Sequence, residues 1–213
     1  KGVAITTETG AHYVFKKAED MDKTGVRLRM NPPVRWGSEG HGDYLLQGLR
    51  DGRVNQIATD HSPHTSEEKL TDSIWTAISG FPGVETSVSY FLTYGVNAGR
   101  MSLQELVRAT SDGPARTWDM WPQKGAIRLG SDGDLTIVDL KKEGILRDDD
   151  LHSKNHVTPF DGDAIKGAPV ATIVRGQIVM REGEIVGQAA GRMVRPRAAA
   201  DRSARTKEPV AVG

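Results

Sequence analysis

The stretch VNQIATDHSPHT, residues 54–65, joins a short apolar run to a cluster of polar side chains. Residues 54–60 have the length and composition of a β-strand. Asp60, His61 and His64 then follow at the point where that strand ends. In parallel α/β folds, the carboxyl ends of the strands carry the ligand-binding groups. The stretch therefore predicts a parallel sheet with a polar site at its strand ends.

The residues that precede this stretch complete a strand, helix, strand pattern. VAITTE (3–8) alternates and is rich in β-branched residues, which predicts a strand. HGDYLLQGLRDG (41–52) predicts a helix that has Tyr44 and Leu49 on one face and Gly52 at its C-terminal cap. A helix between two strands is the repeating unit of a parallel α/β fold, so this is the fold class we expect.

The residues that follow the stretch predict further helices. Residues 80–99 begin with a Gly/Pro turn and continue as a helix. Residues 101–120 contain a helix start, because Ser102 is followed three residues later by Glu105, which is the pattern of a capping box. Pro114 suits the first turn of a further short helix.

The character of the sequence changes near residue 124. Residues 124–140 predict two strands around a Gly/Ser/Asp turn. Residues 168–187 predict a β-meander with turns at 175–176 and 182–183. The final stretch is rich in Ala, Arg and Pro and lacks periodicity, which indicates an extended tail.

These patterns divide the chain into three parts. We expect an α/β part over 1–120, an all-β part over 121–190 and an extended tail over 191–213. The chain begins at Lys1, without Met and inside a predicted strand, so we also expect that an N-terminal portion of the protein precedes it.

The composition excludes several classes of protein. Of the 213 residues, 28 are basic and 28 acidic, so no charge excess favours nucleic acid or an anionic membrane as a partner. The chain has 0 cysteines, which leaves His, Asp, Glu or a modified Lys as possible metal ligands. No apolar run approaches the ~20 residues of a membrane span, and no signal peptide opens the chain. We expect a cytoplasmic protein.

The chemistry of the polar cluster has two readings. A carboxylate at a strand end can bind a divalent cation and accept a proton from metal-bound water, but Asp60 can equally cap the following loop. His61 and His64 can bind zinc or a substrate carboxylate. Catalytic zinc needs three protein ligands, and His12 and His41 add no recognised spacing. Asn31 precedes two prolines that make a rigid turn, for which a purely structural role is the simpler local reading.

In their order and spacing, six stretches resemble the cyclic amidohydrolases, the group of dihydroorotase, hydantoinase/dihydropyrimidinase and allantoinase. The resemblance covers residues 3–187, and the stretches are ETGAHYVF, MNPPVR, IATDHSPHTSEEK, GFPGVET, KGAIRLGSDGDLTIVDL and TPFDGDAIKGAPVATIVRGQIV. Asn31 in NPPVR and His64 in TDHSPHT are similar to the dihydroorotase pattern. The resemblance implies the C-terminal part of a TIM-like (β/α)8 barrel plus part of a small β-sandwich.

The resemblance also implies roles for particular residues. Asp60 corresponds to the aspartate after barrel strand eight, which binds the metal and is the catalytic general base. Asn31, His64, Ser79 and Gly80 correspond to substrate-binding positions. The implied cofactor is zinc, one or two ions in the complete protein, and the implied substrate is a small cyclic amide.

The function that we expect is therefore a zinc-dependent dihydroorotase of pyrimidine biosynthesis. Hydantoinase/dihydropyrimidinase or allantoinase activity is the alternative of the same class, and a non-catalytic structural subunit is the alternative of another class. The remaining metal-binding residues of the family pattern lie outside this chain, which puts turnover by the chain alone in doubt. We expect the chain to pack against a complementary N-terminal segment or to form a homo-oligomer.

Overall fold

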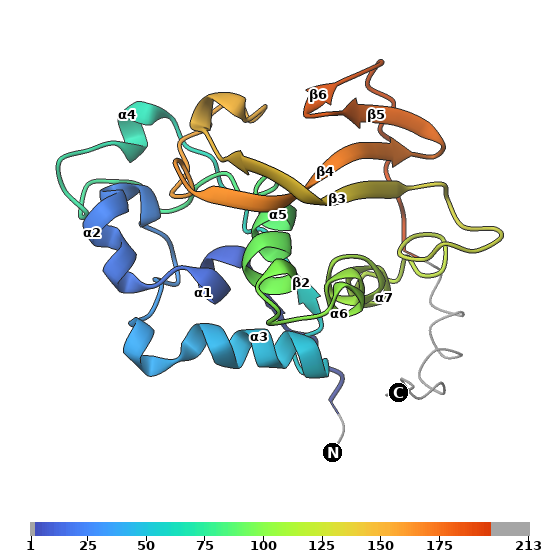
Figure 1. Ribbon diagram of the computed structural model, residues 1–213, viewed down its shortest axis with the longest axis horizontal. Helices are drawn as coiled ribbons and strands as arrows, with labels where there is room; N and C mark the ends of the chain where they lie inside the picture. Colours follow the sequence, from blue (N-terminus) through green and yellow to red (C-terminus); the bar gives the residue numbers. More distant parts are fainter. Residues whose placement is uncertain (1–2, 197–213) are drawn as a thin grey trace.

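The computed structural model describes residues 3–196 (Figure 1). Its helical part consists of β1 (Glu8–Thr9), α1 (Ala11–Phe15), α2 (Met21–Thr24), α3 (His41–Asp51), β2 (Gln56–Ile57), α4 (Ser66–Lys69), α5 (Ser87–Phe91), α6 (Leu103–Val107) and α7 (Gly113–Thr117). A four-stranded sheet follows, made of β3 (Leu135–Ile145), β4 (Ala164–Val174), β5 (Gln177–Arg181) and β6 (Glu184–Ile185). Short 3-10 turns cover Ala18–Asp20, Gly25–Leu28, Gly37–Glu39 and Asp148–Asp150. Two π-helical segments cover Leu92–Asn97 and Arg108–Asp112.

The first two strands form the predicted parallel pair. Glu8 lies beside Gln56 and Thr9 beside Ile57, and the Ala58 amide extends the ladder by donating to the Thr9 carbonyl at 2.9 Å. Both strands are shorter than the predicted ranges 3–8 and 54–60. Among the described residues each strand has one neighbour, and only the residues that pair with it adopt ladder geometry.

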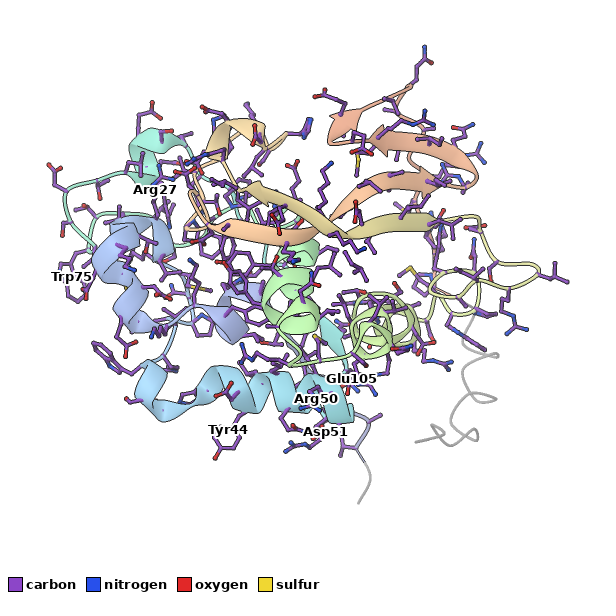
Figure 2. All side chains as sticks on the ribbon, viewed as in Figure 1. Arg27, Tyr44, Arg50, Asp51, Trp75 and Glu105 are labelled. Carbon is purple, nitrogen blue, oxygen red and sulfur yellow. The ribbon has the colours of Figure 1, made fainter. Side chains whose placement is uncertain are left out.

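The helix α3 lies on the connection between these two strands, as predicted. Gly52 ends it in the left-handed conformation at φ 78°, a conformation that glycine adopts without strain. Leu46 and Leu49 enter the core. Tyr44, which we expected on the same face as Leu49, is instead 74% exposed and points away from the molecule (Figure 2).

The predicted helix starts after residue 80 are confirmed. In α6, the Glu105 amide donates to Ser102 Oγ at 3.2 Å and the Ser102 amide donates to Glu105 Oε2 at 2.6 Å. Pro114 lies in the first turn of α7. The helix α5 continues into the π-helical segment Leu92–Asn97, and Phe91 and Leu92 are fully buried in the core.

The sheet confirms the β-meander and corrects one strand. Its order is β3-β4-β5-β6, all antiparallel, and its last two turns lie at 175–176 and 182–183 as predicted. The predicted strand that begins at residue 124 is wrong, because regular β-structure starts only at Leu135. Lys124 binds the carboxylates of Asp132 and Asp134, and these ion pairs hold 124–134 as a loop.

The sheet packs against the helical part through β4 (Figure 1). Asn97 Nδ2 donates to the Leu140 carbonyl at 3.0 Å and to the Lys166 carbonyl at 2.6 Å. Gly167 allows this approach, since a Cβ there would lie 2.9 Å from the Leu92 Cβ. The β-sandwich and the boundary at residue 120 remain predictions.

A partly buried ion pair joins the two parts. Lys16 Nζ lies 2.7 Å from Asp163 Oδ2, and the Tyr90 hydroxyl donates to the same oxygen at 2.5 Å. Burial, reinforced by the charge of Asp163, raises the pKa of Tyr90, so this hydroxyl remains a donor.

Two further expectations concern the extended C-terminal tail and the lack of a membrane-spanning segment. Residues 191–196 have no helix or strand, and the rest of the predicted tail lies outside the described residues. Across residues 3–196, every helix is too short or too polar to cross a bilayer.

Candidate active site

Asp60 lies three residues beyond β2, at the carboxyl end of the parallel pair. Its side chain is exposed and its backbone is left-handed, with φ 48°. Asp and Asn tolerate this conformation better than other residues that carry a Cβ. The turn ends the strand, and the next residue makes an isolated parallel bridge with Phe81.

Tyr13 connects the Asp60 region with the loop of Asn31. Its hydroxyl donates to the Pro32 carbonyl at 3.3 Å. Burial, together with the negative charge of Asp60, raises the pKa of Tyr13 to about 12, so the hydroxyl stays protonated at neutral pH. Asn31 is exposed at the start of this proline turn. In the GAHY stretch the sequence indicated His12 as a possible site residue, but it is the neighbouring Tyr13 that binds the Pro32 carbonyl.

The ring of His61 holds the loop that contains GFPGVET. Its Nδ1 accepts hydrogen bonds from the amides of Gly83 at 3.2 Å and Val84 at 3.3 Å. Accepting at Nδ1 places the ring proton on Nε2. Glu85 in the same loop accepts from the His152 amide at 2.9 Å and the Ser153 amide at 3.2 Å. His61 therefore orders the loop, a role that the sequence did not indicate for it.

His64 lies next to the Ser79–Gly80 segment. Its Nε2 lies 3.3 Å from Ser62 Oγ. A Cβ built at Gly80 would lie 2.7 Å from the same Ser62 Oγ, so Gly80 and Ser62 are in direct contact. The Gly80 amide already donates to the Arg29 carbonyl at 3.0 Å. Any contact of Gly80 with a ligand must therefore use its carbonyl or Cα.

The expected residues thus lie in one connected region. Tyr13 is hydrogen-bonded to the Asn31 turn and lies within the electrostatic influence of Asp60, and Ser62 lies against both His64 and Gly80. The Gly80 amide donates to the carbonyl of Arg29, which lies two residues before Asn31. This hydrogen bond joins the Ser79–Gly80 segment to the Asn31 turn.

His12, which could have joined the cluster, is a buried core residue. Its side chain is 2% exposed, and burial lowers its pKa to about 4, so the ring is neutral. It packs against Tyr13, with ring centroids 4.2 Å apart, and against Phe81, with centroids 5.3 Å apart. His12 Nε2 and Gln56 Oε1 are buried and have no hydrogen-bond partner among residues 3–196.

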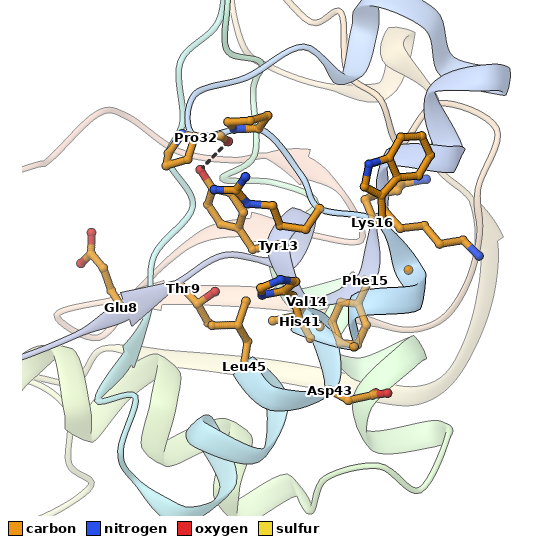
Figure 3. A pocket seen from close by; sticks show the side chains of 17 residues that line it. Glu8, Thr9, Tyr13, Val14, Phe15, Lys16, Pro32, His41, Asp43 and Leu45 are labelled. Carbon is orange, nitrogen blue, oxygen red and sulfur yellow. Dashed lines mark hydrogen bonds between the residues drawn. The ribbon is translucent and has the colours of Figure 1, made fainter.

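A hollow lies beside this region (Figure 3). Its volume is about 390 Å³, and it is bordered by α1, the proline turn and the start of α3. Tyr13 and Pro32 line it, but Asp60, His64 and Gly80 do not. The hollow therefore lies beside these candidate residues and does not enclose them.

The described residues do not by themselves fit a zinc site. Residues 3–196 contain no group of three or more His, Asp or Glu side chains placed to hold a metal ion. Catalytic zinc needs three protein ligands. Asp60 is suited to supply one of them, because its carboxylate is exposed at the strand end.

These features are those of part of a barrel-type α/β domain whose ligand-binding loops lie at the carboxyl ends of parallel strands. Residues 2–179 match the Amidohydrolase family, so this chain belongs to that family.

Two curated relatives show how much of the family fold the chain covers. It is 36% identical over 188 residues to L-hydantoinase of Paenarthrobacter aurescens, a match that covers 87% of this chain and 41% of the relative. It is 39% identical over 183 residues to dihydroorotase of Methanothermobacter thermautotrophicus, covering 85% and 40%. The chain therefore spans about two fifths of the length of these relatives.

Solved structures agree with the sequence comparison. L-Hydantoinase (dihydropyrimidinase) from Arthrobacter aurescens superposes with a TM-score of 0.82 at 35% identity, covering 86% of this chain and 41% of that one. D-Hydantoinase (dihydropyrimidinase) from a Thermus species gives 0.79 at 30% identity, covering 88% and 42%. The described residues therefore have the mixed α/β fold of these amidohydrolase structures, which is consistent with part of a barrel-type domain.

Proposed function

We propose that this chain forms the Asp60 side of the active site of a cyclic amide hydrolase, with dihydroorotase as the most favoured activity. The observation that supports it is the position of Asp60 at the carboxyl end of β2, in one connected region with Asn31, His64 and Gly80. The enzyme class rests on family membership and on the names of the relatives.

In this proposal Asp60 is the general base. Its carboxylate accepts a proton from the attacking water and transfers it to the departing amide nitrogen, and it is also one metal ligand. Zinc, when bound in the complete protein, supplies a water of lowered pKa. In this proposal the remaining ligands come from parts of the complete protein other than residues 3–196.

The other expected residues bind the substrate. Asn31 and His64 can each donate a hydrogen bond to a ring carboxylate, the group that separates dihydroorotate from hydantoin and dihydrouracil. Ser79 and Gly80 contribute backbone contacts to the ring. For Gly80 the contact is made by its carbonyl or Cα, since its amide is already used.

Hydantoinase activity is the second candidate. It is favoured by the L-hydantoinase match at 36% identity and by the TM-score of 0.82 to a solved L-hydantoinase. A substrate panel of dihydroorotate, hydantoin, dihydrouracil and allantoin separates the two, because a preference for dihydroorotate requires recognition of its carboxylate. Metal analysis separates an enzyme from a structural subunit, with about one or two zinc ions per protomer expected for the enzyme.

The substitution Asp60→Asn in the complete protein tests the assignment of the base. We expect turnover to fall by about 10² to 10⁴-fold, the usual contribution of a general base. The control is Asp72→Asn, which removes an exposed carboxylate after α4 and should leave turnover unchanged. His64→Ala should raise KM more than it lowers kcat. Near-normal steady-state turnover in Asp60→Asn would refute the role of Asp60.

A further inference from the structure

Among residues 3–196, Lys69 is the most deeply buried charged residue that the proposed mechanism does not use. It is the last residue of α4 and belongs to the polar run SEEK, a composition that is typical of an exposed helix. Its side chain is 1% exposed, while Glu67 and Glu68 beside it are exposed. Burying an ammonium is costly unless it is fully hydrogen-bonded. Its partners therefore indicate what it does.

The Lys69 ammonium binds two backbone carbonyls from separate loops. Nζ donates to the Arg29 carbonyl at 2.7 Å and to the Ile78 carbonyl at 3.1 Å. It also lies 5.8 Å from the centroid of the Phe81 ring, within range of a cation–π interaction. Burial, together with the charge of Arg29, lowers the pKa of Lys69 to about 8, so the group is largely cationic at neutral pH.

The two carbonyls belong to the two proposed substrate-binding loops. Arg29 lies two residues before Asn31, and Ile78 lies directly before Ser79. The Arg29 carbonyl also accepts from the Gly80 amide at 3.0 Å, so Lys69 and Gly80 share one acceptor. The Ile78 amide donates to the Glu68 carbonyl at 3.0 Å, which attaches the second loop to α4 as well.

We propose that Lys69 is a positioning residue, whose ammonium sets the distance between the Asn31 loop and the Ser79–Gly80 loop. The proposal rests on the proposed function, because it is that function which makes these loops substrate-binding. The ammonium joins both carbonyls to α4: the Ile78 carbonyl accepts from Lys69, and the Arg29 carbonyl accepts from Lys69 and from the Gly80 amide. Lysine is long enough to reach both and carries three donors on one atom.

The variant Lys69→Met separates positioning from packing, because methionine keeps an apolar stem of similar length and removes the donors. In the complete protein we expect KM for the preferred substrate to rise about tenfold, with kcat within about threefold, because a misplaced loop weakens substrate binding. We expect hydrogen exchange of the Gly80 amide to accelerate by about tenfold, because the loop that carries its acceptor is no longer held to α4 and opens more often.

The matched control is Lys16→Met. Lys16 is also a largely covered lysine near aromatic rings, but its ammonium binds the carboxylate of Asp163 instead of a carbonyl of either loop. This control should lower the melting temperature without changing KM or Gly80 exchange. If Lys69→Met fails to fold, Lys69→Gln keeps one amide donor and should give a smaller change in the same direction.

The outcomes distinguish this proposal from the proposed function. Wild-type protein that turns over none of the four cyclic amides contradicts the function, and Gly80 exchange still tests the role of Lys69. Unchanged KM and unchanged Gly80 exchange in Lys69→Met, with only a lower melting temperature, would overturn the positioning role.

Discussion

The left-handed backbone of Asp60 affects how its side chain can be tested. A residue with a Cβ at φ 48° is strained by about 1 kcal/mol or more, and Asp and Asn are the least affected. Alanine at this position would remove the carboxylate and add backbone strain at the same time. Asparagine keeps the turn and the volume, so the loss of activity in Asp60→Asn reports on the carboxylate alone.

His12 predicts a pH dependence of stability. Its pKa is lowered by burial from 6.5 to about 4, so between these pH values the unfolded state binds more protons than the folded state. Its contribution to stability is therefore complete above pH 6.5 and is lost as the pH falls toward 4, by about 3 kcal/mol in total. His12→Phe keeps a ring and cannot titrate.

The measurement is urea unfolding of both proteins at pH 7 and pH 4.5. The free energy of unfolding of the wild type should fall by more than that of His12→Phe over this interval. Parallel curves for the two proteins would contradict a neutral, buried His12.

At the scale of the elements, Gly80 is the most constrained point of the site. Its φ of 115° is a glycine conformation, and a Cβ would lie 2.7 Å from Ser62 Oγ and 2.9 Å from the Ser62 carbonyl oxygen. Gly80→Ala should therefore destabilise the protein by about 1–3 kcal/mol and raise KM. The control is Gly183→Ala, which has φ 95° and open space around the new methyl group.

Thermal unfolding of the two variants separates backbone strain from crowding. Gly183→Ala experiences the strain alone and should be less destabilised, with unchanged KM. Equal destabilisation of both variants would mean that Ser62 moves freely away, and that the contact between Gly80 and Ser62 does not hold the loop.

Local signals in the sequence predicted the elements that depend on local chemistry. The capping box at Ser102, the C-terminal cap at Gly52 and the turn at 175–176 were all read correctly, because each is decided by a few neighbouring residues. The strand expected from residue 124 was wrong, because Lys124 pairs with Asp132 and Asp134 across the loop. Such a tertiary ion pair leaves no periodicity in the sequence.

The candidate site was predictable only in part. The resemblance to a family and the strand end pointed to Asp60, and the structure connects it to the other expected positions. Lys69 was not found, because a lysine in SEEK has the pattern of a solvated helix end. Its burial depends on two carbonyls that are 40 and 9 residues away in the sequence. The capping box between Thr65 and Glu68 is the one local sign that α4 has a fixed orientation.

At the scale of the whole molecule, the pair of Lys16 and Asp163 joins the helical part to the sheet. The two side chains are 9% and 29% exposed and come from positions 147 residues apart. Asp163→Asn should destabilise the protein by about 2 kcal/mol, because the buried ammonium loses its counter-charge. A double-mutant cycle with Lys16→Met should give a coupling energy of about 1–2 kcal/mol.

Calorimetry gives the second readout of this cycle. If the pair couples the two parts, Asp163→Asn should broaden the unfolding transition or separate it into two, whereas the wild type unfolds in one step. Additive effects of the two substitutions would show that the ion pair carries no coupling.

The π-helical segment that ends at Asn97 has a consequence for the contact between the helical part and the sheet. A π-helical turn holds one more residue than an α-helical turn, and here that residue brings the Asn97 amide to carbonyls on both β3 and β4. In a regular α-helix the same six residues would place Asn97 about 100° further around the axis and carry its amide off the sheet. The wider turn is therefore what holds this junction together, so a substitution that tightens it should loosen the sheet even though no contacting side chain is changed.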